Sequence, residues 1–259
     1  MKRTRFMILK KYAGQAIVAL IIAGAACQPA NAAPITTVFD AGWTQIASED
    51  YVGASGYVNP GYGGQDFDAE YLYYKLSGTT LSIGLQSGFD LIDGSVYYSG
   101  KTYYAGDLAL SFDNNKSVYE YAFDFGLLTK DYYDRLVDAD LAASDGKDAA
   151  GLYAVSQWNN SIYFTAATPF AMDGGSLISS GATSAGYDGT LDSYWRIVSF
   201  DITSIGDFDG LDAHWTMSCG NDVIDGHAAA PVPEPATMLL FGTGITGLAA
   251  WQRRRFRKA

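Results

Sequence analysis

Nucleophilic or acid–base catalysis in this chain would have to use its few histidine and cysteine side chains. His214 lies in an alternating segment opposite Trp215, and His227 follows shortly after it. Neither histidine belongs to an H-E-x-x-H motif, and no G-x-S-x-G motif occurs, so neither hydrolase signature is present. Cys219 faces the same side as Trp215, which favours a buried small hydrophobe over a reactive thiol. We therefore predict a chain without catalytic activity of its own.

Carboxylates are far more numerous, and their chemistry would be cation binding or sugar hydrolysis. The segment 33–232 contains 27 acidic and 7 basic residues, so no single pair can be assigned as the two carboxylates of a glycosidase. The stretch GDFDGLD places Asp207, Asp209 and Asp212 around a glycine and predicts a candidate calcium site outside the EF-hand register. A second acidic stretch, DADLAASDGKD at 138–148, has the same character. The alternative for both is a solvated acidic turn, and no other cofactor is expected.

Tyrosines are the third group with a possible binding role. The chain has 19 Tyr beside 13 Phe and 5 Trp, more rings than one core accommodates. In SVYYSGKTYYAG, a Ser-Gly hairpin turn is predicted between two tyrosine pairs, and successive strand residues face opposite sides, so one ring of each pair must point outward. Exposed rings stack on sugars, whereas the alternative is cross-strand aromatic packing at a sheet edge. The candidate sugar-stacking residues are Tyr97, Tyr98, Tyr103 and Tyr104.

The elements that must position these groups are short β-strands. Apolar residues alternate with polar ones in many segments separated by Gly, Asn, Asp and Ser, which predicts an all-β, antiparallel β-sandwich or jelly-roll-like body. One segment, 127–146, has apolar residues at helical spacing and is either a short helix or an acidic excursion over an edge of the sandwich. The predicted strands are 36–46, 70–76, 80–85, 106–112, 118–125, 160–167, 194–202 and 212–219.

The N-terminus has the pattern of a secretory signal. Five basic residues within 1–11 precede an apolar stretch at 16–26, and Ala30-Asn31-Ala32 follows as a small-residue cleavage site. This predicts a signal-peptide helix in residues 1–32, handled by the Sec translocon and cleaved by signal peptidase after Ala32. Eleven apolar residues are too few for a membrane anchor. Lipidation at Cys27 is a weaker alternative because Gly24 stands where lipoprotein signals usually carry a larger aliphatic residue.

The C-terminus combines a rigid segment, an apolar run and a basic end. Pro233, Glu234 and Pro235 form an extended, exposed tripeptide because each proline disfavours helix around it. Residues 236–251 carry no charge and predict a single transmembrane helix about 24 Å long. The basic cluster then stays cytoplasmic, so the body faces the periplasm in a transient inner-membrane intermediate. That cluster consists of Arg253, Arg254, Arg255, Arg257 and Lys258.

Two other interpretations of this C-terminal segment do not fit its sequence context. Gly242, Gly244 and Gly247 match the dinucleotide-binding pattern G-x-G-x-x-G, but that pattern requires a preceding strand and a helix that opens in water, so we reject it. A permanent tail anchor would leave the Pro-Glu-Pro tripeptide unexplained.

Together these C-terminal features resemble the PEP-CTERM sorting signal of Gram-negative bacteria. The resemblance implies recognition by an exosortase, removal of the tail, and delivery to the cell surface or extracellular matrix. The body at 33–232 is strongly acidic, which excludes nucleic acid as a partner. We expect a signal peptide at 1–32, an exported domain at 33–227, and a linker with the sorting signal at 228–259. The expected role is structural or adhesive; the alternative is a polysaccharide-binding module or a polysaccharide-active enzyme with exopolysaccharide as partner.

Overall fold

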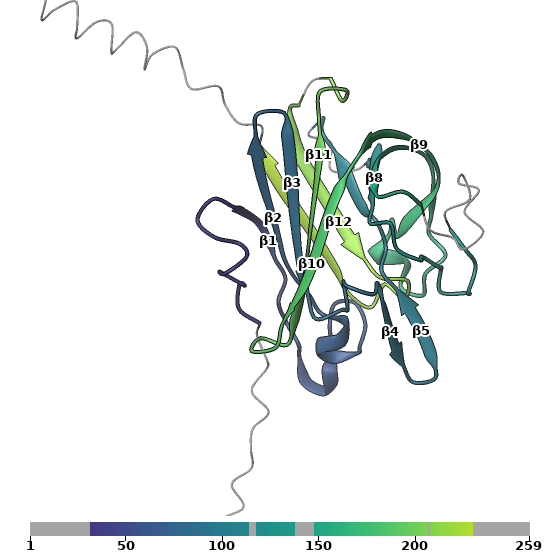
Figure 1. Ribbon diagram of the computed structural model, residues 1–259. Coiled ribbons are helices and arrows are strands. Elements are labelled where there is room, and N and C mark those ends of the chain that lie inside the picture. The colour runs from purple at the N-terminus through teal and green to yellow at the C-terminus, as the bar shows by residue number, and fades with distance from the viewer. Residues whose placement is uncertain (1–31, 114–117, 138–147, 207, 230–259) are drawn as a thin grey trace, which may run out of the picture.

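Alternating apolar residues of the body form two antiparallel β-sheets that pack against each other (Figure 1). The computed structural model describes residues 32–113, 118–137, 148–206 and 208–229. All pairings between the strands of these sheets are antiparallel, as the sequence predicts. The first sheet has the order β1 (Thr44–Ser48), β2 (Ala69–Ser77), β3 (Thr80–Ser87), β11 (Ser193–Asp201) and β10 (Ala182–Asp188).

The second sheet covers the inner face of the first, and a separate hairpin extends from one end of the body (Figure 1). The hairpin consists of β4 (Ser95–Tyr98) and β5 (Lys101–Tyr104). The order of the second sheet is β13 (Val223–Ala229), β12 (Gly210–Thr216), β6 (Leu108–Ser111), β7 (Tyr121–Asp124), β8 (Gly151–Asn159) and β9 (Ala171–Ser180).

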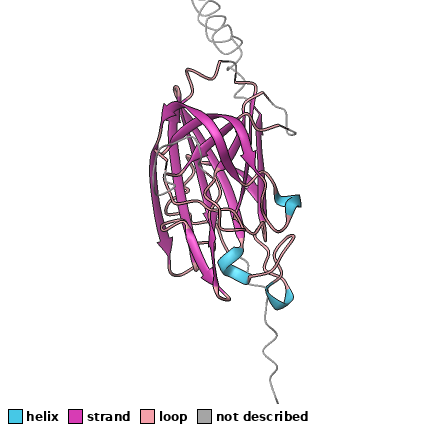
Figure 2. Ribbon diagram, turned by 90° about the vertical axis from the view of Figure 1, so that its right-hand side faces the viewer, coloured by secondary structure: helices cyan, strands magenta, loops and turns pink. Residues whose placement is uncertain are grey.

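Helical structure among the described residues is limited to three short 3-10 turns: η1 (Ala54–Gly56), η2 (Gly64–Phe67) and η3 (Thr165–Ala167). Figure 2 shows these turns toward one end of the layered strands. No described helix is long and apolar enough to cross a bilayer. The predicted signal helix and the predicted transmembrane helix at 236–251 lie outside the described residues, and the domain boundaries at 32 and 227 stay predictions.

The main core fills the space between the two sheets. Trp215 on β12 is fully buried, its ring lies 6.0 Å from that of Phe89, and its indole nitrogen donates to the carbonyl oxygen of Gly106 at 3.1 Å. Met217 and Cys219 belong to the same core, as the alternation predicts. Burial of such large apolar side chains is the main source of stability in a fold of this size.

One predicted strand is wrong in part, and another is wrong altogether. Only the end of the predicted strand 36–46 is extended, because the chain turns at Ile35 and lays Phe39 on the outer face of the first sheet, with its ring stacked 4.2 Å from Tyr73. The segment 160–167 is not a strand: Ile162 and Ala167 enter a small satellite core with Phe170, and the segment ends in η3. Apolar residues at these positions pack from turns, which periodicity alone does not distinguish from a strand.

The described part of the segment with helical spacing, 127–137, is not the short helix that was one of its two interpretations. Residues 127–137 contain turns and an isolated bridge between Lys130 and Leu136, with no helix. Residues 138–147 lie outside the described residues, so the predicted acidic excursion is described only in its first part.

Candidate functional site

The predicted hairpin turn positions the four candidate sugar-stacking tyrosines. Ser99 and Gly100 have φ angles of 49° and 87°, the left-handed values that a tight two-residue hairpin requires. Tyr98 and Tyr103 lie on one face of the hairpin and contact Phe67, with ring centroids 5.5 Å and 5.2 Å from its ring. The two tyrosine pairs therefore divide between the faces of the hairpin, as the alternation predicts.

The other face of the hairpin carries Tyr97 and Tyr104. Tyr97 is 74% exposed, whereas Tyr104 is half-buried and its ring lies 5.9 Å from the ammonium group of Lys130. Tyr103 is also half-buried, so only Tyr97 and Tyr98 of the four predicted rings are largely accessible. Their binding of a sugar stays a prediction.

Three further tyrosines extend this group of rings, and the sequence interpretation missed them. Tyr132 lies 6.3 Å from Tyr103, 5.2 Å from Tyr133 and 5.5 Å from Tyr163, measured between ring centroids. Tyr133 and Tyr163 are 63% and 62% exposed, while Tyr98 is 47% exposed. We call Tyr98, Tyr103, Tyr132, Tyr133 and Tyr163 the aromatic surface. The adjacent tyrosines in TKDYYDR were a visible signal, but their approach to the hairpin could not be read from the sequence.

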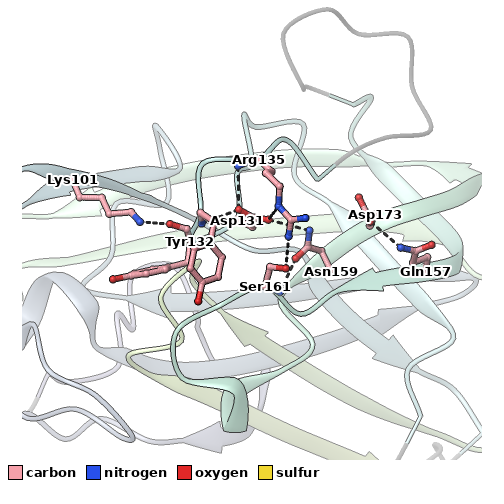
Figure 3. A network of polar contacts seen from close by, with 9 residues as sticks. Lys101, Asp131, Tyr132, Arg135, Gln157, Asn159, Ser161 and Asp173 are labelled. Atoms are coloured by element: carbon pink, nitrogen blue, oxygen red, sulfur yellow. Dashed lines mark hydrogen bonds and ion pairs between the residues drawn. The ribbon is translucent and has the colours of Figure 1, made fainter.

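A polar network fixes the backbone beneath the aromatic surface (Figure 3). The buried carboxylate of Asp131 pairs with the guanidinium of Arg135 at 2.7 Å, and Arg135 also donates to Ser161. The amide nitrogen of Tyr132 donates to the carbonyl oxygen of Ser161 at 3.2 Å. Lys101 donates to the carbonyl oxygen of Tyr132 and lies 3.5 Å from the centre of its ring. The hairpin, the loop after β7 and the loop after β8 are thus joined into one surface.

Each histidine is hydrogen-bonded to an aspartate through Nδ1, His214 to Asp225 and His227 to Asp212. His214 Nδ1 lies 2.8 Å from Asp225, and its Nε2 faces the carbonyl oxygens of Ala167 and Pro169 at 3.2 Å and 2.9 Å. Burial would raise the pKa of Asp225, but the hydrogen bond and charge of His214 outweigh burial and lower that pKa. Because both ring nitrogens of His214 are engaged, this residue has no free nitrogen with which to activate a nucleophile.

Cys219 is buried in the main core, and burial raises the pKa of its thiol to about 12. A thiol in this state is almost entirely protonated at neutral pH, and only the thiolate is a good nucleophile. The prediction that Cys219 packs as a small hydrophobe is confirmed.

The predicted calcium ligands do not converge among the described residues. Asp207 lies outside them, and Asp212 is buried with one carboxylate oxygen 2.7 Å from Nδ1 of His227. Asp209 lies in the loop before β12, where its amide donates to the carbonyl oxygen of Phe112. The described acidic side chains that do converge are Glu49, Asp68 and Asp222. They are distant in sequence, so no local spacing could have indicated them.

The predicted sorting residues lie mostly outside the described residues. This applies to Ala30, to the tripeptide Pro233, Glu234 and Pro235, and to the basic cluster from Arg253 to Lys258. Ala32 is described and buried: its amide donates to Asp50 at 2.7 Å, and its carbonyl oxygen accepts from Tyr71 at 2.9 Å. Cleavage after Ala32 would remove this residue and its contacts with Asp50 and Tyr71. The cleavage position stays a prediction.

Comparison with known proteins identifies the C-terminal segment. Residues 231–255 match the family model of the PEP-CTERM protein-sorting motif, a range that includes the Pro-Glu-Pro tripeptide, the apolar run and the first three arginines of the basic cluster. No curated protein and no solved structure matches the chain. The motif implies an exported protein that is processed by an exosortase. The chain therefore carries a PEP-CTERM protein-sorting motif at residues 231–255.

Proposed function

We propose that this protein is a non-catalytic structural or adhesive component of the cell surface or extracellular matrix. The observation that carries the proposal is the sorting motif at 231–255 on a chain that begins with a secretory signal pattern. In the proposed route the chain is exported, held briefly in the inner membrane by residues 236–251, and cleaved near Pro-Glu-Pro. The basic cluster keeps the tail end in the cytoplasm until cleavage.

The described body fits a role that does not involve catalysis. Its candidate nucleophile, Cys219, is buried, and both nitrogens of His214 are engaged in hydrogen bonds. The antiparallel sandwich presents broad sheet faces, an architecture widely used for surface proteins. An acidic body with few basic residues also stays soluble outside the cell and is repelled by anionic membranes.

The sorting proposal is tested by the intact mass of protein recovered from the native cell surface. We expect the mature chain to lack both the signal peptide and roughly the last 25 to 28 residues, as the position of the motif implies. A chain with Pro233→Ala and Pro235→Ala should keep its tail and remain in the membrane fraction. Pro231→Ala, a matched proline substitution outside the tripeptide, should be processed normally. Recovery of wild-type surface protein with the tail attached, in cells that have an exosortase, would contradict the proposal.

Polysaccharide binding is a second candidate function, and the aromatic surface favours it. The exposed rings of Tyr133 and Tyr163 both pack against Tyr132, and each leaves ring surface open on which a sugar could stack. Two of the five Lys and Arg residues among the described residues, Lys101 and Arg135, lie at or beneath these rings. Basic groups gathered there in an otherwise acidic body favour an anionic exopolysaccharide as the ligand.

A further inference from the structure

Three carboxylates from three different elements meet at the seam between the two sheets. Glu49 directly follows β1, Asp68 directly precedes β2, and Asp222 directly precedes β13. One oxygen atom from each lies within 4.8 Å of the others. β13 belongs to the second sheet and packs on β1 and β2 of the first, so the three groups span both sheets. We call Glu49, Asp68 and Asp222 the buried carboxylate cluster.

Asp68 is the member that the protein itself does not satisfy. Its side chain is fully buried, and neither carboxylate oxygen makes a hydrogen bond of good geometry; the amide of Tyr51 gives only weak compensation. Oε2 of Glu49 is likewise buried without a partner. No Lys, Arg or His in the described part of the chain forms an ion pair with any of the three. A buried carboxylate without a partner is costly when it is charged, so either a proton or a bound cation must compensate Asp68.

Asp222 differs because the backbone holds it in place. Its two oxygens accept hydrogen bonds from the amides of Ala69 and Val223, at 2.7 Å and 2.8 Å. The hydrogen bond to Ala69, the residue that follows Asp68, fixes the turn before β13 against the start of β2. The two aspartates therefore have a preset geometry, which is the usual arrangement in a binding site.

Two more acids surround the cluster but are already engaged. Glu70 accepts hydrogen bonds from Gln65, Gln86 and Ser193, at 2.7, 2.7 and 2.8 Å. Asp50 accepts from the amide of Ala32 and the hydroxyl of Tyr71. These two carboxylates add negative potential to the cluster without offering free oxygens.

The pKa values of the three carboxyl groups also show that their negative charges are poorly compensated. Burial, followed by the neighbouring carboxylates, raises the pKa of Asp68 to about 8. Burial raises the pKa of Asp222 to about 9, and the charges of Glu49 and Asp68 raise it further. Burial raises the pKa of Glu49 to about 7, although a hydrogen bond with Asp222 acts in the opposite direction. A cation with two positive charges would remove this repulsion and displace the protons.

We propose that Glu49, Asp68 and Asp222 bind one calcium ion that joins the two sheets at this end of the sandwich. The donor set contains only carboxylate oxygens, which suit a hard cation and exclude the thiolate and imidazole preferences of zinc or copper. Carboxylates from three separate loops tolerate the long and variable bonds of Ca²⁺ better than the strict octahedron of Mg²⁺. The rival explanation is that the acids share protons and bind no metal.

Calorimetric titration and thermal unfolding of the full-length chain, purified in detergent and treated with a chelator, test the proposal at pH 8. Calcium should bind with release of protons and raise Tm by about 5 to 10 °C at a concentration 100-fold above Kd. Magnesium should have a much smaller effect. Asp68→Asn and Glu49→Gln should abolish both the heat and the shift in Tm, without lowering Tm in the presence of chelator because each removes a buried charge.

Asp212→Asn provides the matched control, because Asp212 is a buried aspartate of the other candidate calcium site. This variant should keep the full response to calcium. No heat and no change in Tm for the wild-type chain would overturn the proposal, as would a calcium response that survives Asp68→Asn. Loss of the response in Asp212→Asn alone would move the site to the 207–212 loop and also overturn it. Equal stabilisation by magnesium would overturn the assignment to calcium.

Discussion

The ring of Tyr103 on β5 lies 6.3 Å from the ring of Tyr132, in the loop after β7. This contact joins the hairpin to a loop that also carries Tyr133, and the hydrogen bond from Lys101 to Tyr132 reinforces it. The exposed tyrosines are therefore held on a fixed framework and need little ordering when a ligand binds, which lowers the entropic cost of binding.

If the aromatic surface binds an anionic exopolysaccharide, Tyr133→Ala and Tyr163→Ala should each weaken binding by about five- to tenfold, because each removes one stacking ring. Both rings are largely exposed, so the fold should be unaffected. Retention on immobilised polysaccharide or binding to a glycan array measures the effect. Tyr187→Ala, which removes a ring 47% exposed on β10, is the matched control. Unchanged binding in the double variant would exclude this surface as the site.

Stability of the metal-free protein should fall as pH rises from about 5 to about 9. Asp222, Asp68, Glu49 and Glu70 have pKa values raised by burial to about 9, 8, 7 and 7, well above those of an unfolded chain. Groups with raised pKa values stabilise the folded state at low pH, and that contribution is lost as pH rises through the folded-state values. Tm measured with chelator from pH 5 to pH 9 checks this.

The control for the pH series is Asp68→Asn, which removes one of these groups and should reduce the slope. Burial also raises the pKa of Asp124 to about 7, so some slope should remain. Asp201 has a pKa lowered by hydrogen bonds, chiefly from Thr203 and Thr79, and its contribution is lost only in acid, below about pH 4. A metal-free Tm that rises between pH 5 and pH 8 would contradict the assignment of the buried acids.

Cys219 should resist alkylation in the folded protein. With a thiol pKa raised by burial to about 12, its thiolate fraction at pH 8 is about a thousandfold lower than that of an ordinary cysteine. We expect iodoacetamide to label a Cys27→Ala chain at least that much more slowly when folded than in denaturant; the substitution removes the other cysteine. Rapid labelling of the folded chain would show that the core opens at this point.

Gly100→Ala should destabilise the protein by about 1 to 2 kcal/mol, because Gly100 has a φ of 87°, which is unfavourable for residues with a Cβ atom. No atom lies within 4 Å of the added methyl group, so the cost is purely conformational. Gly189→Ala is the matched control, since its Cβ would meet only ordinary contact with Tyr187 and its φ is not left-handed. Urea midpoints with unchanged m-values measure the difference. Equal midpoints would mean that the hairpin is not part of the cooperative fold.

The sequence predicted the strands that have one apolar and one polar face. The segments at 80–85 and 194–202 became β3 and β11, which pair along most of their length. β10, in contrast, contains mostly small and polar residues, such as Thr183, Ser184 and Gly186, and its side chains are largely exposed. It forms a strand because β11 provides a template for backbone hydrogen bonds, which no side-chain pattern reveals.

The candidate sites divide in the same way. The turn at Ser99-Gly100 was predictable because its chemistry is local, and the outward rings of the hairpin follow from the alternation of strand residues. The approach of Tyr132 to Tyr103 and the meeting of Glu49 with Asp222 depend on how distant segments pack. Local spacing contains no information on such contacts. The sequence also has so many acidic residues that the few buried ones cannot be told from the exposed ones by residue type.

β13 ends at Ala229 and lies at the edge of its sheet, with β12 as its neighbour in the strand order. The sorting motif begins two residues later, so any pull exerted on the tail reaches the body first through this border strand. Its resistance to peeling comes from the hydrogen bonds to β12 and from the buried side chains of Ile224 and Ala228. A calcium ion bound by Asp222 would tether the opposite end of the same strand to the first sheet. Detachment of β13 from its Ala229 end would then stop before the two sheets separated.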